Sequence, residues 1–162
     1  MGCCKNRNKP SIESKLGGWS IDKSVYQWIR SNAEDGETIL ELGSGYGTEV
    51  LSKHYSMFSI EHDRKFLGRF SSTFIHSQLL DSWYDPRSIS DFLPRNYTLL
   101  LVDGPPGDRS GILNHLELFN PSKFWLINNT DREKDRMIFE EICLKLNSEK
   151  YLVFDKFSVI IV

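Results

Sequence analysis

Residues 38–63 read TILELGSGYGTEVLSKHYSMFSIEHD, and this stretch decides the fold. The apolar run 38–42 predicts a short buried strand. Residues 43–47 form a glycine loop, and 48–54 can begin a helix. A second strand follows and ends at Glu61. A strand, a glycine turn, a helix and a neighbouring strand make up half of a doubly wound nucleotide-binding fold.

The loop and the acid that follows it suit a nucleoside ligand. Glycines let the backbone turn sharply at a strand end and approach a ligand closely. The carboxylate of Glu61 would stand at the tip of the neighbouring strand, where it can accept both hydroxyls of a ribose. Charge-assisted hydrogen bonds of this kind are worth about 1.5–3 kcal/mol each. A G-x-G turn alone can carry a dinucleotide or another nucleoside, so the spacing has to separate them.

The spacing is G-x-G-x-G rather than G-x-G-x-x-G, and Glu41 stands two places before the first glycine. This pattern, followed by an acid at the next strand end, resembles the first two motifs of class I S-adenosylmethionine (SAM) methyltransferases. The resemblance implies that Glu41 lies near the methionyl ammonium, and that Glu61 holds the ribose with His62 at its border. It also implies that the loop contacts the cofactor through Gly43, Ser44, Gly45, Tyr46 and Gly47. The alternative is a tight strand-to-helix turn that binds no ligand.

The segment 77–84 is expected to cross the carboxyl end of the sheet, where adenine lies in this family. Trp83 or Tyr84 would then stack on the base, and Gln78 or Asp81 would bind its amino group. Alternatively, the two aromatic residues belong to the core or its rim. The sequence leaves both interpretations open.

The second informative stretch is the loop DGPPGDR at 103–109, which follows the apolar run 97–102. It comes after the predicted fourth strand, beside the point where the strand order reverses and ligands bind. Asp103 is the predicted catalytic base or acceptor orienter, with capping of the next turn as the alternative. Pro105 and Arg109 are expected to border the acceptor, although Arg109 can equally be solvated.

The same loop bears on the acceptor. By resemblance it occupies the position of the motif beside the transferred methyl group. In amino-methylating DNA enzymes an acid or amide, two prolines and an aromatic stand there. Here Gly104 is inserted and Gly107 replaces the aromatic residue, which disfavours a nucleic-acid acceptor. A D-G-P-x-G loop is closer to small-molecule or glycan O-methyltransferases.

A metal-dependent version is also considered. In catechol-type enzymes an acid and an Asp-Asn pair bind Mg²⁺, and the matching positions are Asp103, Asn128 and Asn129. Oxygen ligands suit a hard cation, but Asn128 replaces a carboxylate and lowers the charge of the site. Turn formation and helix capping are therefore favoured for the two asparagines, and Mg²⁺ is possible but not favoured.

The rest of the chain completes the pattern. We predict helices that begin near Ser20, at 63–70 and at Ser110, a fifth strand at 123–127, a helix that ends near Asn147, and a terminal hairpin. The predicted fold is α/β: a three-layer, Rossmann-like, mostly parallel sheet with a C-terminal antiparallel hairpin strand. A flexible arm at 1–19 would precede a single domain at 20–162.

Composition sets outer bounds. The chain has 162 residues, a formal net charge of -2 and three cysteines. A nucleic-acid binder usually carries a basic face, but here basic residues gather only at Lys5, Arg7 and Lys9. Nucleic acid and membrane are therefore not expected as partners. The cysteine spacing favours neither disulfides nor zinc, which indicates a cytoplasmic protein. The oligomeric state is left open.

Three functions compete. The first is a SAM-dependent methyltransferase acting on a small molecule or exposed group, with oxygen favoured as the acceptor atom. The second is a non-catalytic subunit that binds SAM or a nucleotide. The third is a nicotinamide-dependent oxidoreductase, which the glycine spacing and the lack of a Tyr-x-x-x-Lys pair disfavour.

Overall fold

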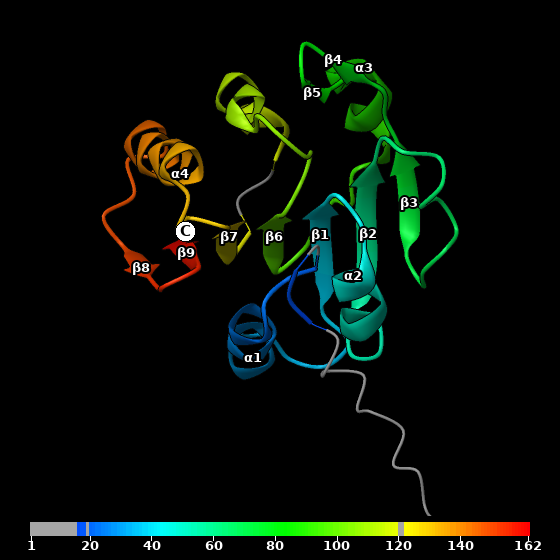
Figure 1. Cartoon of the computed structure of the whole chain (residues 1–162), viewed down its shortest axis with the longest axis horizontal. Helices are drawn as coiled ribbons and strands as arrows, with labels where there is room; N and C mark the ends of the chain where they lie inside the picture. The colour runs from blue at the N-terminus through cyan, green and yellow to red at the C-terminus, as the bar shows by residue number, and fades with distance from the viewer. Residues whose placement is uncertain (1–15, 19, 120–121) are drawn as a thin grey trace, which may run out of the picture.

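The computed structural model describes residues 16–18, 20–119 and 122–162. Seven strands form one sheet in the order β3-β2-β1-β6-β7-β9-β8 (Figure 1). The strands from β3 to β7 are parallel, whereas β9 and β8 run antiparallel to their neighbours. Their bounds are β1 Thr38–Leu42, β2 Ser56–Glu61, β3 Thr73–His76, β6 Leu99–Val102, β7 Phe124–Asn128, β8 Tyr151–Val153 and β9 Phe157–Ile161.

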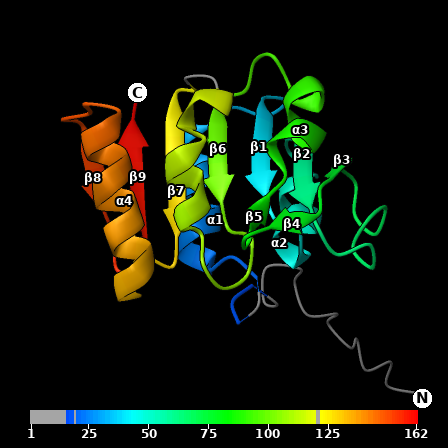
Figure 2. The same ribbon diagram turned by 90° about the horizontal axis from the view of Figure 1, so that it is seen from above.

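The chain reverses direction across the sheet between β1 and β6. It first moves outward from β1 to β2 and β3, and then returns to place β6 on the other side of β1. The parallel strands all point the same way in Figure 2, so their carboxyl ends share one edge of the sheet. This is the switch point at which open α/β sheets bind ligands.

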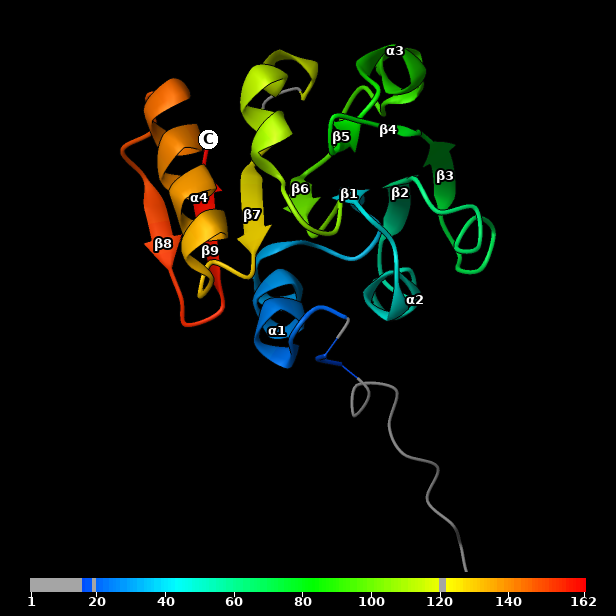
Figure 3. The same ribbon diagram turned by 45° about the horizontal axis from the view of Figure 1, so that its top comes forward.

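Helices cover both faces of the sheet, as Figure 3 shows. One face carries α1 (Lys23–Asn32) and α2 (Tyr46–Leu51), and the other carries α3 (Pro86–Ile89) and α4 (Glu133–Lys145). Alternate residues of each central strand belong to two separate hydrophobic clusters, with Ile39 in one and Leu40 in the other. Burial on both faces explains why these strands are continuous apolar runs. The predicted three-layer α/β fold with its antiparallel hairpin is therefore confirmed.

Several predicted helices differ from the structure. Residues 63–70 form successive turns instead of a helix, with Gly68 in the left-handed region at φ +70°. The helix predicted from Ser110 is two short 3-10 helices, η3 (Ser110–Asn114) and η4 (Leu116–Leu118). α1 is capped by Asp22, which accepts a hydrogen bond from the Ser24 backbone N–H, rather than by Ser20.

The segment 77–84 forms a small two-stranded ribbon of β4 (Leu79–Leu80) and β5 (Trp83–Tyr84). Asp81 and Ser82 make its turn, with φ of 48° and 70°. Two central residues with positive φ match the twist of a tight hairpin. A 3-10 helix, η2 (Ser90–Phe92), follows α3 and leads toward β6.

The two ends of the chain differ in how far they can be described. Most of the predicted arm at 1–19 lies outside the described residues. At the other end, β8 pairs with β9 on one side, and its residues Tyr151, Leu152 and Val153 are exposed. Among the described helices, none has both the length and the apolar character needed to cross a membrane.

Candidate functional site

The candidate site lies where the loops after β1 and β6 meet. A Cβ atom placed on Gly104 would stand 2.8 Å from the Gly43 Cα and 2.8 Å from the Tyr84 hydroxyl oxygen. Gly43 also has φ +87°, a conformation that L side chains rarely adopt. The two backbones therefore pack directly against each other, and only glycine fits at this crossing.

The other two loop glycines differ in what surrounds them. A Cβ on Gly47 would lie 2.9 Å from the Ile21 Cγ1, so this glycine is needed for packing against the segment before α1. At Gly45 no atom lies within 4 Å of the Cβ position, and its φ of -176° is ordinary extended backbone. The protein's own packing does not require a glycine there. The Cβ position of Gly45 therefore faces open space beside the loop.

Glu61 is buried at the end of β2 and is bonded to the glycine loop. Its Oε2 accepts the Ser44 N–H at 3.0 Å and the Ser44 hydroxyl at 2.7 Å. Its Oε1 accepts the backbone N–H groups of His62 and Asp63 at 2.7 and 2.8 Å. The His62 Nδ1 is 3.0 Å from the same oxygen but lacks the alignment of a hydrogen bond. The structure thus brings Glu61, Ser44 and His62 together.

Glu41 lies beneath the start of α2 rather than at the surface. Its Oε2 accepts hydrogen bonds from the hydroxyls of Thr48 and Ser59, both at 2.8 Å. The Thr48 Oγ1 also accepts the Gly45 N–H at 2.9 Å, which links the carboxyl group to the loop. Burial raises the pKa of Glu41 to about 8, an effect that the two hydroxyl donors oppose.

Asp103 directly follows β6 and keeps 23% of its side chain exposed. Its Oδ1 accepts the Asn128 Nδ2 at 2.7 Å, and the Arg109 Nη2 is 3.8 Å away. Desolvation raises the pKa of Asp103, while the Asn128 hydrogen bond and the Arg109 charge act in the opposite direction. Asp103 is thus held in place yet remains within reach of a molecule at the sheet edge.

Among the described residues, the structure adds no further ligand to the possible Mg²⁺ site at Asp103, Asn128 and Asn129. Asn128 turns its amide nitrogen toward Asp103, and Asn129 makes a turn with φ 63°. In the described part of the chain, no group of three or more His, Cys, Asp or Glu side chains gathers around a possible metal position.

Arg109 is the largest correction to the sequence interpretation, because it is neither solvated nor free to meet an acceptor. Its side chain is only 6% exposed. The guanidinium donates to the carbonyl oxygens of Asp103 at 2.6 Å, Asn128 at 3.0 Å and Pro105 at 3.3 Å, and to the Asp135 Oδ1 at 3.3 Å. Pro105, expected near the acceptor, is buried as well. Arg109 therefore joins the ends of β6 and β7 to α4.

The ribbon separates the residues expected around adenine. Gln78 and Asp81 are exposed, whereas Trp83 and Tyr84 are buried in the hydrophobic core. The Trp83 side chain fills the space beside Gly111. A Cβ atom placed on Gly111 would lie only 2.4 Å from the Trp83 Cβ. Of the two interpretations of the aromatic pair, the structure matches the core one. The Tyr84 hydroxyl lies at the loop crossing without a hydrogen-bond partner among the described residues.

Sequence reasoning missed the groups that support Glu41 and Arg109. Ser59 is opposite Glu41 in the parallel register of β1 and β2, a relation that follows only once the strands are paired. Thr48, the third residue of α2, could have been found from its spacing after the glycine loop. Nothing in the sequence indicates that Asp135 pairs with Arg109, because an acid in the first turn of a helix is ordinarily exposed.

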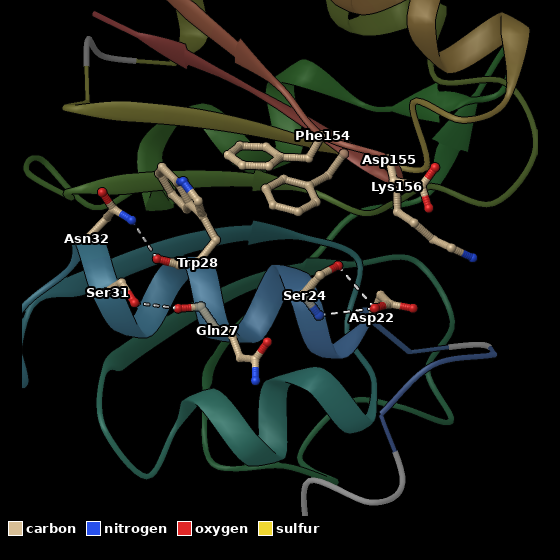
Figure 4. Close-up of a pocket in the computed structure, with 10 residues that line it drawn as sticks. Asp22, Ser24, Gln27, Trp28, Ser31, Asn32, Phe154, Asp155 and Lys156 are labelled. Atoms are coloured by element: carbon tan, nitrogen blue, oxygen red, sulfur yellow. Dashed lines mark hydrogen bonds between the residues drawn. The ribbon is translucent and has the colours of Figure 1, made fainter.

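A separate groove of about 540 Å³ runs along α1 beside the turn that joins β8 to β9 (Figure 4). Trp28 and Phe157 meet there with their ring centres 6.4 Å apart, and Phe154 stacks on Phe157 at 4.5 Å. None of the site residues predicted from the sequence lines this groove.

Comparison with known proteins identifies the fold but no close relative. No protein-family model matches the sequence, and no curated protein matches it significantly. Among solved structures, the MycE methyltransferase of the mycinamycin biosynthetic pathway aligns with a TM-score of 0.59 and 12% identity. The alignment covers 94% of this chain but only 54% of that one. The chain thus spans about half the length of that enzyme.

Two further structures align over most of their own length. A precorrin 8w decarboxylase from Methanobacterium thermoautotrophicum has a TM-score of 0.57 and 14% identity, covering 91% of this chain and 92% of that one. A methyltransferase-like protein from Silicibacter pomeroyi has a TM-score of 0.54 and 18% identity, covering 96% and 87%. At such low identity the likeness shows the fold. That fold is the Rossmann-like fold of class I SAM-dependent methyltransferases.

Replacing Arg109 by methionine tests its structural role. Arg109→Met leaves the buried Asp135 without its cation and several carbonyl groups without a donor. We expect the free energy of unfolding, measured by urea denaturation, to fall by about 3–5 kcal/mol. Arg64→Met, at an exposed position, should change it by less than about 0.5 kcal/mol. A loss below about 1 kcal/mol for Arg109→Met would contradict the role assigned to it.

The raised pKa of Glu41 predicts how stability depends on pH. In the unfolded chain this carboxyl group loses its proton above its ordinary pKa of 4.5, whereas in the folded protein it keeps the proton up to about pH 8. Its contribution to stability is therefore complete below pH 4.5 and is lost as the pH rises to 8. Between pH 5.5 and 7.5, wild type should lose about 1 kcal/mol per pH unit relative to Glu41→Gln, which stays neutral. If wild type and Glu41→Gln differed in free energy of unfolding by the same amount at both pH values, the assignment would be contradicted.

Proposed function

We propose that this chain is a SAM-dependent methyltransferase that acts on a small molecule or an exposed group, with oxygen favoured as the acceptor atom. One observation carries the proposal. Among the three glycines of the loop at 43–47, Gly45 is the one whose Cβ position faces open space. It lies next to Ser44, which is bonded to the buried Glu61 at the switch point of a methyltransferase fold.

The residues present fit such a cofactor. The Glu61 carboxylate suits a ribose hydroxyl, and the space at Gly45 suits the methionyl part. Gln78 and Asp81 are exposed on the ribbon and can bind the amino group of adenine. When bound, SAM supplies an electrophilic methyl group on a positively charged sulfur.

The chain's contribution to the reaction is placement and proton handling. Placement of a nucleophile in line with its target supplies much of the rate in such a displacement. A base is needed only where the acceptor has to lose a proton. Asp103 fits that role because the Asn128 amide orients its carboxylate and part of its surface is open. Arg109 contributes indirectly, by holding the Asp103 backbone through its carbonyl oxygen.

Two of the similar proteins are associated with small molecules by name. MycE was solved with mycinamycin VI, S-adenosylhomocysteine (SAH) and Mg, and the precorrin protein is named for a small molecule. The acceptor class is proposed from the D-G-P-x-G loop and not from these proteins, because a shared fold does not transfer a substrate or a metal. A non-catalytic SAM-binding subunit is the second candidate, since the carboxyl group of Asp103 is already engaged by Asn128.

Calorimetric titration tests the cofactor. SAM or SAH added to the purified chain should bind with a micromolar Kd, and NAD should produce no binding heat. Glu61→Ala should weaken the binding at least about tenfold, because the ribose loses a charge-assisted hydrogen bond. Glu49→Ala, exposed on α2, is the matched control, and circular dichroism should show both variants folded. Absence of heat with both SAM and SAH would overturn the proposed function.

A second experiment separates the enzyme from the binding subunit. Hydroxyl-bearing small molecules are screened for SAH formation, with and without Mg²⁺. Asp103→Ala should then lower turnover by about 10²–10⁴-fold and leave the Kd for SAH within about threefold of wild type. The exposed Asp108 provides the control Asp108→Ala. Full activity in Asp103→Ala would remove Asp103 from the reaction, and an acceptor screen that never yields SAH would favour the binding subunit.

A further inference from the structure

The hydrogen bonds of Glu61 fill its capacity as an acceptor. A carboxylate offers about four lone-pair positions on its two oxygens. Two donors reach Oε2, both from Ser44, and two reach Oε1, from the backbone of His62 and Asp63. A ribose hydroxyl that binds Glu61 must therefore replace a donor that is already in place.

Only one of the four donors can leave easily. The N–H groups of His62 and Asp63 belong to the backbone that continues directly from Glu61, and the Ser44 N–H belongs to the glycine loop packed at Gly43 against Gly104. Moving any of these requires a change of backbone. The Ser44 hydroxyl needs only a rotation about its side-chain bond, and Ser44 is partly exposed.

We propose that the Ser44 hydroxyl is an intramolecular competitor for the cofactor, occupying on Glu61 the position that a ribose hydroxyl takes. The inference rests on the proposed function. Ser44 acts through Glu61 and is therefore a positioning residue. It orients the carboxylate in the cofactor-free protein and gives way when the ribose arrives. A loop serine that simply contacts the cofactor would have the opposite effect on affinity.

The sign of the affinity change is the test, with SAH as the probe in calorimetry. Ser44→Ala removes the competitor, so the Kd for SAH should decrease by about three- to tenfold. Ser44→Thr keeps a hydroxyl and should bind within about twofold of wild type. The matched control is Ser52→Ala, whose hydroxyl bonds the Glu49 carbonyl oxygen on α2, away from Glu61.

Thermal unfolding supplies a readout that does not depend on affinity. Without ligand, Ser44→Ala should have a lower Tm than wild type, because Glu61 loses a hydrogen bond. At saturating SAH the difference should shrink, so the Tm increase caused by ligand should be larger in the variant. Circular dichroism establishes that the variant is folded before either measurement.

Each other outcome overturns the inference. Weaker SAH binding by Ser44→Ala would make Ser44 a direct ligand of the cofactor. Unchanged binding would mean that Glu61 accepts the ribose without releasing Ser44. An unchanged Tm of the ligand-free variant would mean that the Ser44 hydroxyl does not restrain Glu61. If wild type itself binds no SAH, the proposed function fails first, and this is visible before any variant is made.

Discussion

A buried guanidinium holds together the edge of the sheet at which the parallel strands end. Arg109 leaves the loop after β6 and donates to the ends of β6 and β7 and to the first turn of α4. Buried carbonyl groups need donors, and this one side chain serves three of them while neutralising Asp135. The position of Asp103, and the contact of Gly104 with the glycine loop, both depend on a loop that Arg109 closes.

The three acids at this edge differ through their surroundings. Glu41 is enclosed under α2, where desolvation favours its protonated form. Glu61 is equally buried but receives four hydrogen bonds. Asp103 lies between these cases, with one amide donor and some exposure to solvent. Similar side chains on neighbouring strands thus have different surroundings.

The sequence predicts what local patterns determine and fails where distant residues decide. Strands and the glycine loop follow from apolar runs and glycine spacing, and they place Glu61 at the end of β2 and Asp103 just after β6, where the structure has them. The helix predicted at 63–70 has the right apolar spacing, but the chain turns there through Gly68. The buried roles of Arg109 and Trp83 depend on partners far along the chain, Asp135 and Gly111. A single sequence does not reveal those pairings.

The open side of β8 has a consequence for how the protein behaves at high concentration. In an antiparallel pair, backbone groups alternate between the neighbouring strand and the free side. The Lys150 carbonyl oxygen accepts the Ile161 N–H of β9, and the Phe154 N–H donates to the Phe157 carbonyl oxygen. By this alternation, the backbone N–H groups of Tyr151 and Val153 point outward. An exposed apolar edge with free amides is a template for a strand from another molecule. Lys150 at one end of β8 and Asp155 beyond the other place charges beside this template, and such flanking charges keep exposed strands from aggregating.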